Sequence, residues 1–447
     1  MKLFGTDGIR GVFGQPPIDR PTLTALAHEL AAFVADESRP VAGRGPLFVV
    51  GGDTRASTDT LFEWLGEGLA AGGARMLWAG VLPTPGVAYL TRHLGADCGI
   101  AISASHNPYE DNGIKLIGAD GFKWDAEEEQ RLEERVRHST LPAVEKLSCR
   151  SPDPELAKRY LEELRSALGE GKPLEGMRIA IDAANGAASP HARGLFEGLG
   201  AQVHCFHDRP TGRNINVACG STHTAEIARL TVETGSDLGV AFDGDADRVL
   251  VADETGRILD GDALLYLWSI GLKREGSLDP ARIVATQMSN IGLERSLARH
   301  GIEVVRCEIG DRAVVREMRN RSILLGGEQS GHLVHLGLST TGDGLLSALQ
   351  IARFARNGRL SRLVDGLELY PQTLRNTVVR EKADFDSVPG LTELVSRVEH
   401  TLGHEGRILL RYSGTEPLAR IMIEGRDLVE IETMAKEIGD LIDRHLG

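Results

Sequence analysis

The chain has 447 residues, about three times the length of a typical single domain, so we expect two to four domains. Hydrophobic residues make up 41% of it and charged residues 26%, which is ordinary for a globular chain and excludes extensive disorder. The 50 Lys and Arg and the 64 Asp and Glu give a net charge of −14. Because the sequence also lacks a basic run, a general nucleic-acid or anionic-membrane surface is not expected.

Neither a membrane span nor an export signal is predicted. The longest apolar stretch, Ala263–Leu272, has about half of the roughly 20 residues that a span requires. The first residues lack the apolar core of a signal peptide. The 5 cysteines are odd in number and form no C-x-x-C pair, so neither a disulfide framework nor a zinc cage is indicated. These features predict a cytoplasmic protein.

The N-terminal segment Phe4–Gly11 reads F-G-T-D-G-I-R-G. This glycine content is too high for the interior of a strand or for a helix. We therefore predict a loop that wraps around a site and delivers the side chain of Arg10.

Three later stretches share one pattern of an apolar strand, a glycine turn, a helical repeat, a second glycine and a second strand. Their opening strands are Leu47–Val50, Arg178–Asp182 and Arg282–Thr286. The pattern is typical of β-α-β units with parallel strands. We expect three related α/β domains in tandem, with mixed or parallel sheets.

The pattern changes after residue 371. A strand is predicted at Leu374–Val379, a helix at Leu391–Leu402, strands at Arg407–Arg411 and Arg420–Glu424, and a helix at the end. This order indicates a smaller C-terminal α+β domain behind the three α/β domains. The predicted domains are 1–150, 151–255, 256–368 and 369–447.

In the first domain, a predicted strand runs into the polar turn Ser103–Pro108. Ser105 lies at the strand end and can expose its hydroxyl in a cleft. No glycines bracket it, so this is not an esterase elbow. Taken alone, the segment is also compatible with a simple Asn-Pro turn. Beside a cation site, a phosphoserine is the chemically natural interpretation, and Lys115 is close enough along the chain to reach the same cleft.

In the second domain, Asp243, Asp245 and Asp247 follow an apolar run at alternating positions. On an extended chain such residues lie about 6.5 Å apart, too far to share one small cation, so the segment must curl. The interleaved residues, Gly and Ala, are small enough to permit this. Carboxylates favour magnesium or calcium, and a solvated acidic loop is the alternative. An EF-hand is excluded because its sixth position, which requires glycine, is Arg248.

Two further glycine-rich turns carry polar groups. Gly326–His332 follows the apolar strand Ile323–Leu325 and presents groups suited to sugar hydroxyls or an amine. Arg411–Pro417 offers a guanidinium, two hydroxyls and main-chain amides, with Arg420 nearby, as a phosphate cradle does. Each turn alone is also compatible with a simple surface hairpin.

Together and in this order, the motifs resemble those of the α-D-phosphohexomutase superfamily. The matching segments are Phe4–Gly11, Ser103–Pro108, Asp243–Arg248 and Gly327–His332. Within the superfamily, the N-terminal motif, Gln329 and Thr341–Gly344 look most like the phosphoglucosamine mutases.

The resemblance implies four domains in a heart-shaped arrangement around a central cleft. It implies the interconversion of glucosamine 6-phosphate and glucosamine 1-phosphate by an intramolecular phosphotransferase, which feeds the synthesis of UDP-N-acetylglucosamine and cell-wall precursors. One Mg2+ per active site is implied, with glucosamine 1,6-bisphosphate as intermediate and activator. The implied partner is a small sugar phosphate, neither nucleic acid nor membrane, with a homodimer as one option for the assembly. A phosphomannomutase/phosphoglucomutase of the same superfamily and a Ca2+-binding protein without catalytic activity are the alternatives.

The resemblance also assigns roles by position. Ser105 would bear the phosphoryl group, and Lys115 and His332 are candidate general acid/base groups. The expected catalytic residues are Ser105, Lys115, His332 and Arg10; the expected substrate-binding residues are Glu328, Ser330, Arg411, Ser413, Gly414, Thr415 and Arg420; and the expected metal ligands are Asp243, Asp245, Asp247 and a phosphate oxygen on Ser105.

Overall fold

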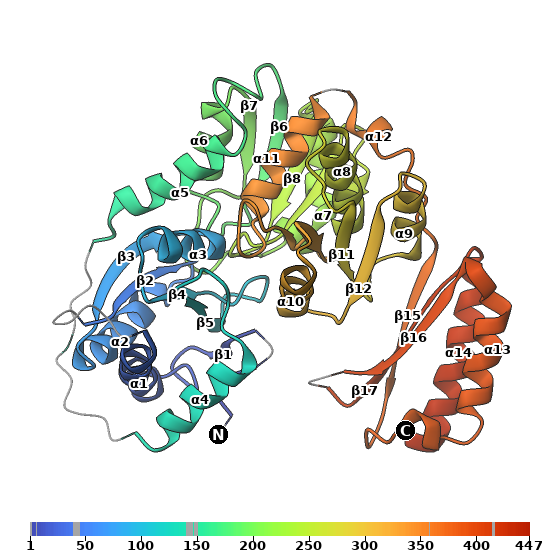
Figure 1. The fold of residues 1–447 in the computed structure, drawn as a ribbon, viewed down its shortest axis with the longest axis horizontal. Helices are drawn as coiled ribbons and strands as arrows, with labels where there is room; N and C mark the ends of the chain where they lie inside the picture. Colours follow the sequence, from blue (N-terminus) through green and yellow to red (C-terminus); the bar gives the residue numbers. More distant parts are fainter. Residues whose placement is uncertain are drawn as a thin grey trace.

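The computed structural model describes residues 2–5, 7–38, 45–139, 146, 151–356, 358–413 and 416–447. Within this part of the chain, four sheets follow one another along the sequence. Figure 1 shows domains I to III along an arch, with domain IV beyond the third domain and its sheet turned back toward the first. Three α/β domains and a smaller α+β domain were predicted, and this architecture is confirmed.

Domain I contains a five-stranded sheet of order β1-β5-β4-β2-β3. Strand β2 pairs in parallel with β3 and β4, whereas β5 pairs antiparallel with β4 and with β1. The elements are β1 (Ile9–Val12), α1 (Arg20–Ser38), β2 (Leu47–Gly52), α2 (Thr58–Ala71), β3 (Arg75–Val81), α3 (Thr84–His93), β4 (Cys98–Ile102), β5 (Asp111–Gly118) and α4 (Ala126–Arg137).

Domain II repeats this plan. Strand β6 pairs in parallel with β7 and β8, and β8 forms an antiparallel hairpin with β9. The short strand β10 pairs with β9, so the second sheet extends beyond residue 255. The elements are α5 (Pro154–Ser166), β6 (Arg178–Asp182), α6 (Ala192–Gly198), β7 (Gln202–Phe206), η1 (Gly220–Thr222), α7 (Thr224–Glu233), β8 (Leu238–Phe242), β9 (Val249–Asp253) and β10 (Ile258–Leu259).

Domain III uses the plan a third time. Its central strand β11 pairs in parallel with β12 and β13, and β13 forms an antiparallel hairpin with β14. The elements are α8 (Gly261–Arg274), β11 (Arg282–Thr286), α9 (Ile291–Ala298), β12 (Glu303–Cys307), α10 (Asp311–Arg321), β13 (Leu325–Gly327), β14 (Leu333–His335), α11 (Gly344–Ala355) and α12 (Leu360–Leu363).

The three repeated sheets place three motifs at equivalent points. The serine motif joins β4 to β5, the aspartate motif joins β8 to β9, and the sugar motif joins β13 to β14. In each case the loop leaves the carboxyl end of a parallel strand and returns along an antiparallel one. Ligand-binding residues in α/β proteins gather at this edge. Repetition of one fold therefore brings three chemically different loops to corresponding positions.

Domain IV is an antiparallel sheet of order β15-β17-β16 with two helices packed beside it (Figure 1). The loop of the predicted phosphate cradle joins β16 to β17. The elements are β15 (Gln372–Val378), η2 (Phe385–Ser387), α13 (Leu391–Leu402), η3 (Gly403–Glu405), β16 (Arg407–Tyr412), β17 (Leu418–Glu424) and α14 (Leu428–Leu446).

The hydrophobic cores show which domains are tied together. One buried cluster runs through domains I, II and III and includes Leu90, Ile181 and Leu349. Domain IV has a separate cluster around Ile421 and Ile438. Domains I to III thus share a continuous core, whereas domain IV is packed as a unit of its own. In the described residues, no helix combines the length and the apolarity needed to cross a membrane.

The N-terminal motif differs from its prediction. It was predicted as a loop, but Ile9–Val12 forms the edge strand β1, paired with β5. An edge strand tolerates glycine because only one side of it must pair. Gly8 has a φ of +76°, and a Cβ there would lie 2.3 Å from the carbonyl oxygen of Ile114. The glycine therefore serves a close approach of two chain segments rather than an open loop.

The sugar motif is also shifted relative to its prediction. Gly326 and Gly327 were predicted in a turn, but they belong to strand β13. A Cβ on Gly326 would lie 2.7 Å from the sulfur of Met318, so this strand position has no room for a side chain. Glycine in a strand interior marks such close packing. The turn itself therefore begins at Glu328.

Candidate active site

The serine loop and the aspartate loop meet. The Ser105 hydroxyl donates a hydrogen bond of 2.6 Å to Oδ2 of Asp243. Ser105 is buried and has a φ of +51°, a conformation that residues other than glycine rarely adopt. A Cβ on Gly244 would lie 2.4 Å from the carbonyl oxygen of Ser105. Glycine at position 244 is therefore what allows the two loops to touch.

The aspartate loop curls into a cluster. Asp243, Asp245 and Asp247 each offer a carboxylate oxygen, all within 4.8 Å of one another, and Ala246 between them has a φ of +53°. Burial, and then the charges of Asp247 and Asp245, raise the pKa of Asp243 well above its ordinary value. One oxygen each of Asp245 and Asp247 is buried with no hydrogen-bond partner in the described structure. A bound divalent cation would relieve this repulsion and satisfy these oxygens, so the donor set fits a metal cofactor.

A buried network of charges adjoins the cluster. Nζ of Lys115 lies 2.8 Å from Asp245 and 3.2 Å from Asp7. Burial lowers the pKa of Lys115, but the charges of Asp245 and Asp7 outweigh it and raise the pKa above its ordinary value. Lys123 pairs with Asp7 at 3.0 Å and also with Asp311 of domain III. The ammonium of Lys115 is therefore charged in this structure, and the network joins domain I to domain III.

Both ring nitrogens of His332 face protein groups. Nδ1 lies 3.6 Å from Oδ2 of Asp247, and Nε2 accepts the main-chain N–H of Gly342 at 3.1 Å. A Cβ on Gly342 would lie 2.4 Å from Cε1 of His332, so only glycine lets the ring pack there. Because Nε2 is an acceptor, the neutral ring carries its proton on Nδ1, toward Asp247. This geometry favours an orienting role for His332.

Two arginines have hydrogen-bond donors without acceptors. Nη2 of Arg10 pairs with Asp7 at 2.8 Å, but its Nη1 is buried with no partner in the described structure. Nε of Arg248 is also buried without a hydrogen-bond partner in the described structure, and it lies 3.8 Å from Oδ1 of Asp247. Burial and then the charges of Arg248 and Arg10 lower the pKa of His106, the residue after the serine. Guanidinium groups in this state are suited to bind phosphate oxygens.

The sugar loop offers a carboxylate held by main chain. Oε1 of Glu328 accepts the N–H of Gly310, at the start of α10, at 3.1 Å. The neighbouring Ser330 is exposed. Nε2 of Gln329 donates to Asp260 at 3.2 Å. In this loop, Glu328 and Ser330 are therefore the residues whose side-chain oxygens can form hydrogen bonds with sugar hydroxyls.

In domain IV, Arg411 and Arg420 lie directly opposite each other on β16 and β17. Like charges in this register repel. Burial and the charge of Arg420 lower the pKa of Arg411. Arg420 pairs with Glu416 at 2.7 Å, but its Nε is buried without a partner among the described residues. An anion between the two guanidinium groups would relieve the repulsion, as a phosphate cradle requires.

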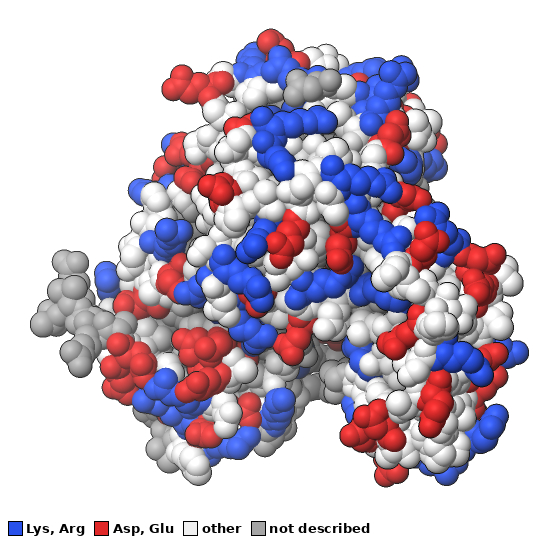
Figure 2. All heavy atoms as spheres, turned by 45° about the vertical axis from the view of Figure 1, so that its right-hand side comes forward, with Lys and Arg blue, Asp and Glu red and all other residues white. Residues whose placement is uncertain are grey.

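Only some of the other residues of the predicted phosphate cradle lie in the described part of the chain. Ser413 is buried and its hydroxyl lies 3.4 Å from Glu416, whereas Gly414 and Thr415 lie outside the described residues. Among the described residues, no hydrogen bond or ion pair joins Arg411, Ser413 or Arg420 to the serine and aspartate loops. Figure 2 shows the surface hollowed between the lower lobes formed by domains I and IV, with basic side chains above the hollow. The structure thus brings together the groups of domains I to III and leaves those of domain IV across this hollow.

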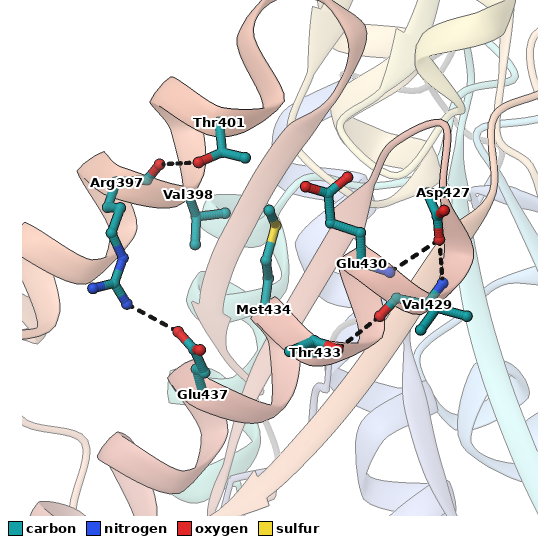
Figure 3. A pocket seen from close by; sticks show the side chains of 9 residues that line it. All are labelled: Arg397, Val398, Thr401, Asp427, Val429, Glu430, Thr433, Met434 and Glu437. Atoms are coloured by element: carbon teal, nitrogen blue, oxygen red, sulfur yellow. Dashed lines mark hydrogen bonds and ion pairs between the residues drawn. The ribbon is translucent and has the colours of Figure 1, made fainter.

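A hollow of about 630 Å³ on domain IV is unrelated to these motifs. It lies between α13 and α14, where Arg397 and Glu437 form an ion pair of 2.9 Å (Figure 3). Asp427 accepts main-chain N–H groups at the start of α14 beside it. Its lining side chains contain no residue of the predicted site, so it is not a candidate active site.

A second trio of metal-ligand type lies in domain II. Asp182, His207 and Cys219 offer ligand atoms within 4.8 Å of one another. The Asp182 carboxylate, however, accepts the main-chain N–H groups of Ala184 and Gly220 at 2.9 and 2.8 Å. These bonds give it a structural role after strand β6, comparable to a turn cap.

Several residues of the site were not predicted to have a role there: Asp7, Asp53, Arg55, Lys123, Asn216 and Asp311. For two of these residues, the sequence alone indicated a place in the site. Asp53 and Arg55 directly follow the buried strand β2, and polar residues at the carboxyl end of a central parallel strand face the ligand edge of the sheet. Asp7 lies within the N-terminal motif, and its partners Lys115 and Lys123 are distant in the same domain. Lys123, Asn216 and Asp311 are recognised through contacts between domains.

Comparison with known families gives four consecutive matches. The phosphoglucomutase/phosphomannomutase alpha/beta/alpha domains I, II and III match residues 1–142, 158–256 and 260–370, and the C-terminal domain of that family matches residues 374–441. Among similar proteins, a phosphoglucosamine mutase of Solibacter usitatus is 43% identical over 450 residues, covering 100% of this chain and 99% of the relative. A phosphoglucosamine mutase of Myxococcus xanthus is 43% identical over 456 residues, covering 100% and 98%.

Solved structures support the fold. A phosphoglucomutase/phosphomannomutase family protein from Burkholderia thailandensis superposes with a TM-score of 0.81 at 23% identity, covering 99% of this chain and 97% of that one. An N-acetylphosphoglucosamine mutase of Aspergillus fumigatus, solved with GlcNAc-6P and magnesium, gives a TM-score of 0.67 at 16% identity, covering 100% and 96%.

Proposed function

We propose that this chain, which belongs to the phosphoglucosamine mutase family, interconverts glucosamine 6-phosphate and glucosamine 1-phosphate. The observation that carries the proposal is the contact of the Ser105 hydroxyl with Asp243, inside the cluster of three buried aspartates. A phosphorylated Ser105 would hold its phosphoryl group beside these three carboxylates, whose charge Lys115, 2.8 Å from Asp245, neutralises only in part.

We assign the metal site to Mg2+. Asp243, Asp245 and Asp247 would hold it, since hard carboxylate oxygens and a small cluster suit this ion. When bound, the ion neutralises negative charge on the transferring phosphoryl group.

The proposed reaction has two phosphoryl-transfer steps. In the first step the bond from phosphorus to Oγ of Ser105 breaks and a bond to the oxygen of the free sugar hydroxyl forms. Oγ gains a proton from Lys115, and the hydroxyl proton passes to Lys115 in its place. Glucosamine 1,6-bisphosphate results and stays bound. In the second step its other phosphoryl group returns to Ser105. Such a loose transition state depends on alignment and charge neutralisation, which Arg10 and Arg248 can provide through N–H groups that have no hydrogen-bond partner.

We assign proton transfer to Lys115 rather than to His332. Both nitrogens of His332 are engaged, by Asp247 and by the N–H of Gly342. Lys115 enters the cycle charged, because Asp245 and Asp7 raise its pKa, so it can give a proton to the leaving oxygen in one direction and recover it in the other.

The bisphosphate must turn over between the two steps. Glu328 and Ser330 would hold sugar hydroxyls, while Arg411, Ser413 and Arg420 would hold the phosphate that is not reacting. Domain IV carries the latter group on a sheet with its own core, so the phosphate site can follow the ligand without disturbing the catalytic cluster. Closure of domain IV over the cleft would also keep water from the phosphoserine.

The test compares three substrates. Glucosamine, glucose and mannose 6-phosphates are assayed side by side with the parent protein and with Ser105→Ala. We expect kcat/KM for the glucosamine phosphate to exceed the others by at least about tenfold, the scale on which a site separates similar sugars. Ser105→Ala should be inactive on all three. A preference for glucose or mannose phosphate would overturn the substrate assignment, and an active Ser105→Ala would overturn the mechanism.

A further inference from the structure

The main chain of the serine loop is held by side chains from two different domains. We propose that Arg55 of domain I and Asn216 of domain II are positioning residues that hold Ser105 in the conformation needed for phosphoryl transfer. Through Asn216, this conformation would require domain II to be docked on domain I. The inference rests on the proposed function.

The hydrogen bonds of the Arg55 side chain go mainly to the main chain of the serine loop. It is 1% exposed, and its Nε pairs with Asp53 at 2.9 Å. Its Nη2 donates to the carbonyl oxygens of Ser105 at 3.2 Å and Asn107 at 2.9 Å, and its Nη1 donates to the carbonyl of Pro108. One buried guanidinium thus holds three carbonyls of a loop whose residues lie 50 or more positions away along the chain.

Asp53 fixes the entry to the same loop. Its Oδ2 accepts the hydroxyl of Ser103 at 2.6 Å, and the oxygen of that hydroxyl accepts the N–H of Ser105 at 2.9 Å. Both main-chain groups of Ser105 are therefore held, the N–H through Asp53 and the carbonyl through Arg55. None of these contacts involves the hydroxyl that would react.

Asn216 adds the contact from domain II. Its Nδ2 donates to the carbonyl of Ser105 at 2.9 Å and to that of Asn107 at 3.0 Å, which are two of the carbonyls that Arg55 holds. The residue is buried, and its own N–H donates to Ala184, next to strand β6. The Ser105 carbonyl is therefore held from both domains at once.

The hydrogen bonds from Arg55 and Asn216 to the Ser105 carbonyl also fix the position of the Ser105 hydroxyl. Ser105 has a φ of +51°, which an L residue adopts only when its surroundings enforce it. Releasing its carbonyl would allow the residue to relax toward negative φ and move Oγ away from Asp243. A displacement of about 1 Å at a reacting atom costs roughly a hundredfold in rate. The sugar and phosphate loops would not move, because they lie on other domains.

The chain offers a matched pair of variants. Asn216→Gly removes the carboxamide, and glycine adopts the φ of +60° at this position without strain. Ala218→Gly, two residues on, is the control: Ala218 also has a positive φ, +51°, but it is exposed and forms no hydrogen bond with the described serine loop. Both substitutions place a glycine at positive φ in the same segment, so any general effect on the segment is shared.

We expect Asn216→Gly to lower kcat by roughly 10- to 100-fold while KM for glucosamine 6-phosphate stays within about threefold. Ala218→Gly should leave kcat within about twofold, and its thermal midpoint should fall less than that of Asn216→Gly, which loses two buried hydrogen bonds. A merely structural role would instead lower kcat of both variants alike, or raise KM together with a loss of thermal stability.

A second pair tests Arg55. Arg55→Lys keeps the charge but cannot reach three carbonyls, so kcat should fall by roughly 100-fold with KM little changed. The control is Arg257→Lys, since Arg257 likewise pairs with a buried aspartate, Asp253 at 3.1 Å, and donates to a carbonyl, that of Ser361. Arg257 lies between β9 and β10, beyond the end of β9 that is remote from Asp247. Arg257→Lys should keep the parent's kcat.

The outcomes are separable. An active parent whose kcat is unchanged by Asn216→Gly and Arg55→Lys would overturn the positioning role alone. A parent without turnover of glucosamine phosphates would overturn the proposed function, and the positioning role with it. A selective loss of kcat in both variants, absent from both controls, is the result that the proposal requires.

Discussion

The hydroxyl of Ser105 and the carboxylate of Asp243 lie 2.6 Å apart, although 138 residues and a domain boundary separate them. Each residue follows the third parallel-type strand of its own sheet, in the loop that leads into an antiparallel hairpin. The continuous core of domains I to III keeps the two sheets in contact. The candidate active site thus combines equivalent loops of two related domains, which carry a serine in one and aspartates in the other.

Asp245→Asn tests the metal role of the cluster. The substitution removes a charge beside the proposed position of the transferring phosphoryl group, and it also removes one of the charged partners of Lys115. We expect kcat to fall by at least about 1,000-fold with the fold intact. Steady-state kinetics and circular dichroism measure the two effects, and Asp208→Asn, a half-buried aspartate of the same domain, is the control. Turnover within about tenfold of the parent would count against the metal assignment.

Arg411→Ala tests the phosphate cradle. Arg411 and Arg420 face each other across β16 and β17, so removing one of them leaves an incomplete anion site. We expect KM for glucosamine 6-phosphate to rise by roughly tenfold or more, with a smaller effect on kcat. Arg397→Ala, in the hollow between α13 and α14 (Figure 3), is the matched control and should leave KM unchanged. An unaltered KM for Arg411→Ala would remove the support for this cradle.

The contact between domains I and III contains a partly buried ion pair. Arg312 donates to both carboxylate oxygens of Glu129, one of them at 2.9 Å, and the Glu129 side chain is 4% exposed. Arg312→Met leaves that carboxylate buried and unpaired, which should cost about 3 kcal/mol of stability. The double variant Glu129→Leu with Arg312→Met should recover most of this loss, because no charge stays behind.

Thermal or denaturant unfolding of the three variants measures this coupling. The exposed pair Arg397 and Glu437, 68% and 53% exposed, provides the comparison. Breaking it should cost less than about 1 kcal/mol. If the Arg312 and Arg397 variants lose equal amounts of stability, the ion pair between domains I and III contributes no more to the free energy of unfolding than an exposed pair does.

Asp343 gives a prediction for pH. Burial raises the pKa of Asp343 to about 6 from an ordinary value of 3.8, against the hydrogen bonds from Leu346 and Tyr160 that lower it. The folded state thus binds the proton more tightly than the unfolded state. The stability that this group contributes is present below about pH 4 and is lost as the pH rises through about 6, by up to about 3 kcal/mol.

Asp343→Asn removes this titration but keeps a side chain that can cap α11. Relative to the parent, we expect the variant to gain stability between about pH 4.5 and 7.5. Thermal midpoints of both proteins at the two pH values measure the change. A difference between the two proteins that does not vary with pH would contradict it.

Much of the fold could be predicted because its signals are local. Arg178–Asp182 and the glycine turn after it indicate a strand and a turn whatever the rest of the chain does. The strand Ile9–Val12 was not predicted, because the local pattern of Phe4–Gly11 is dominated by glycine. Its strand conformation depends on pairing with β5, which lies about 100 residues away in the sequence. Gly326 was misplaced for a similar reason, since its strand position is explained by Met318 of α10.

For the site, the residue types could be predicted and their partners could not. Ser105, Asp243, Asp245 and Asp247 stand out because their chemistry is concentrated in short runs. Lys123 does not, because its partners Asp7 and Asp311 come from distant parts of the chain, and Asn216 becomes informative only once its contact with the Ser105 carbonyl is seen.

The most direct test of the account follows the phosphoryl group itself. Protein labelled on Ser105 by incubation with a 32P-labelled hexose 1,6-bisphosphate is freed of small molecules, mixed with glucosamine 6-phosphate and quenched within a single turnover. We predict that label leaves the protein and appears in glucosamine 1,6-bisphosphate and glucosamine phosphate, and that Ser105→Ala takes up no label. Label that stays on the protein, leaves only as inorganic phosphate, or binds equally to Ser105→Ala would contradict the account.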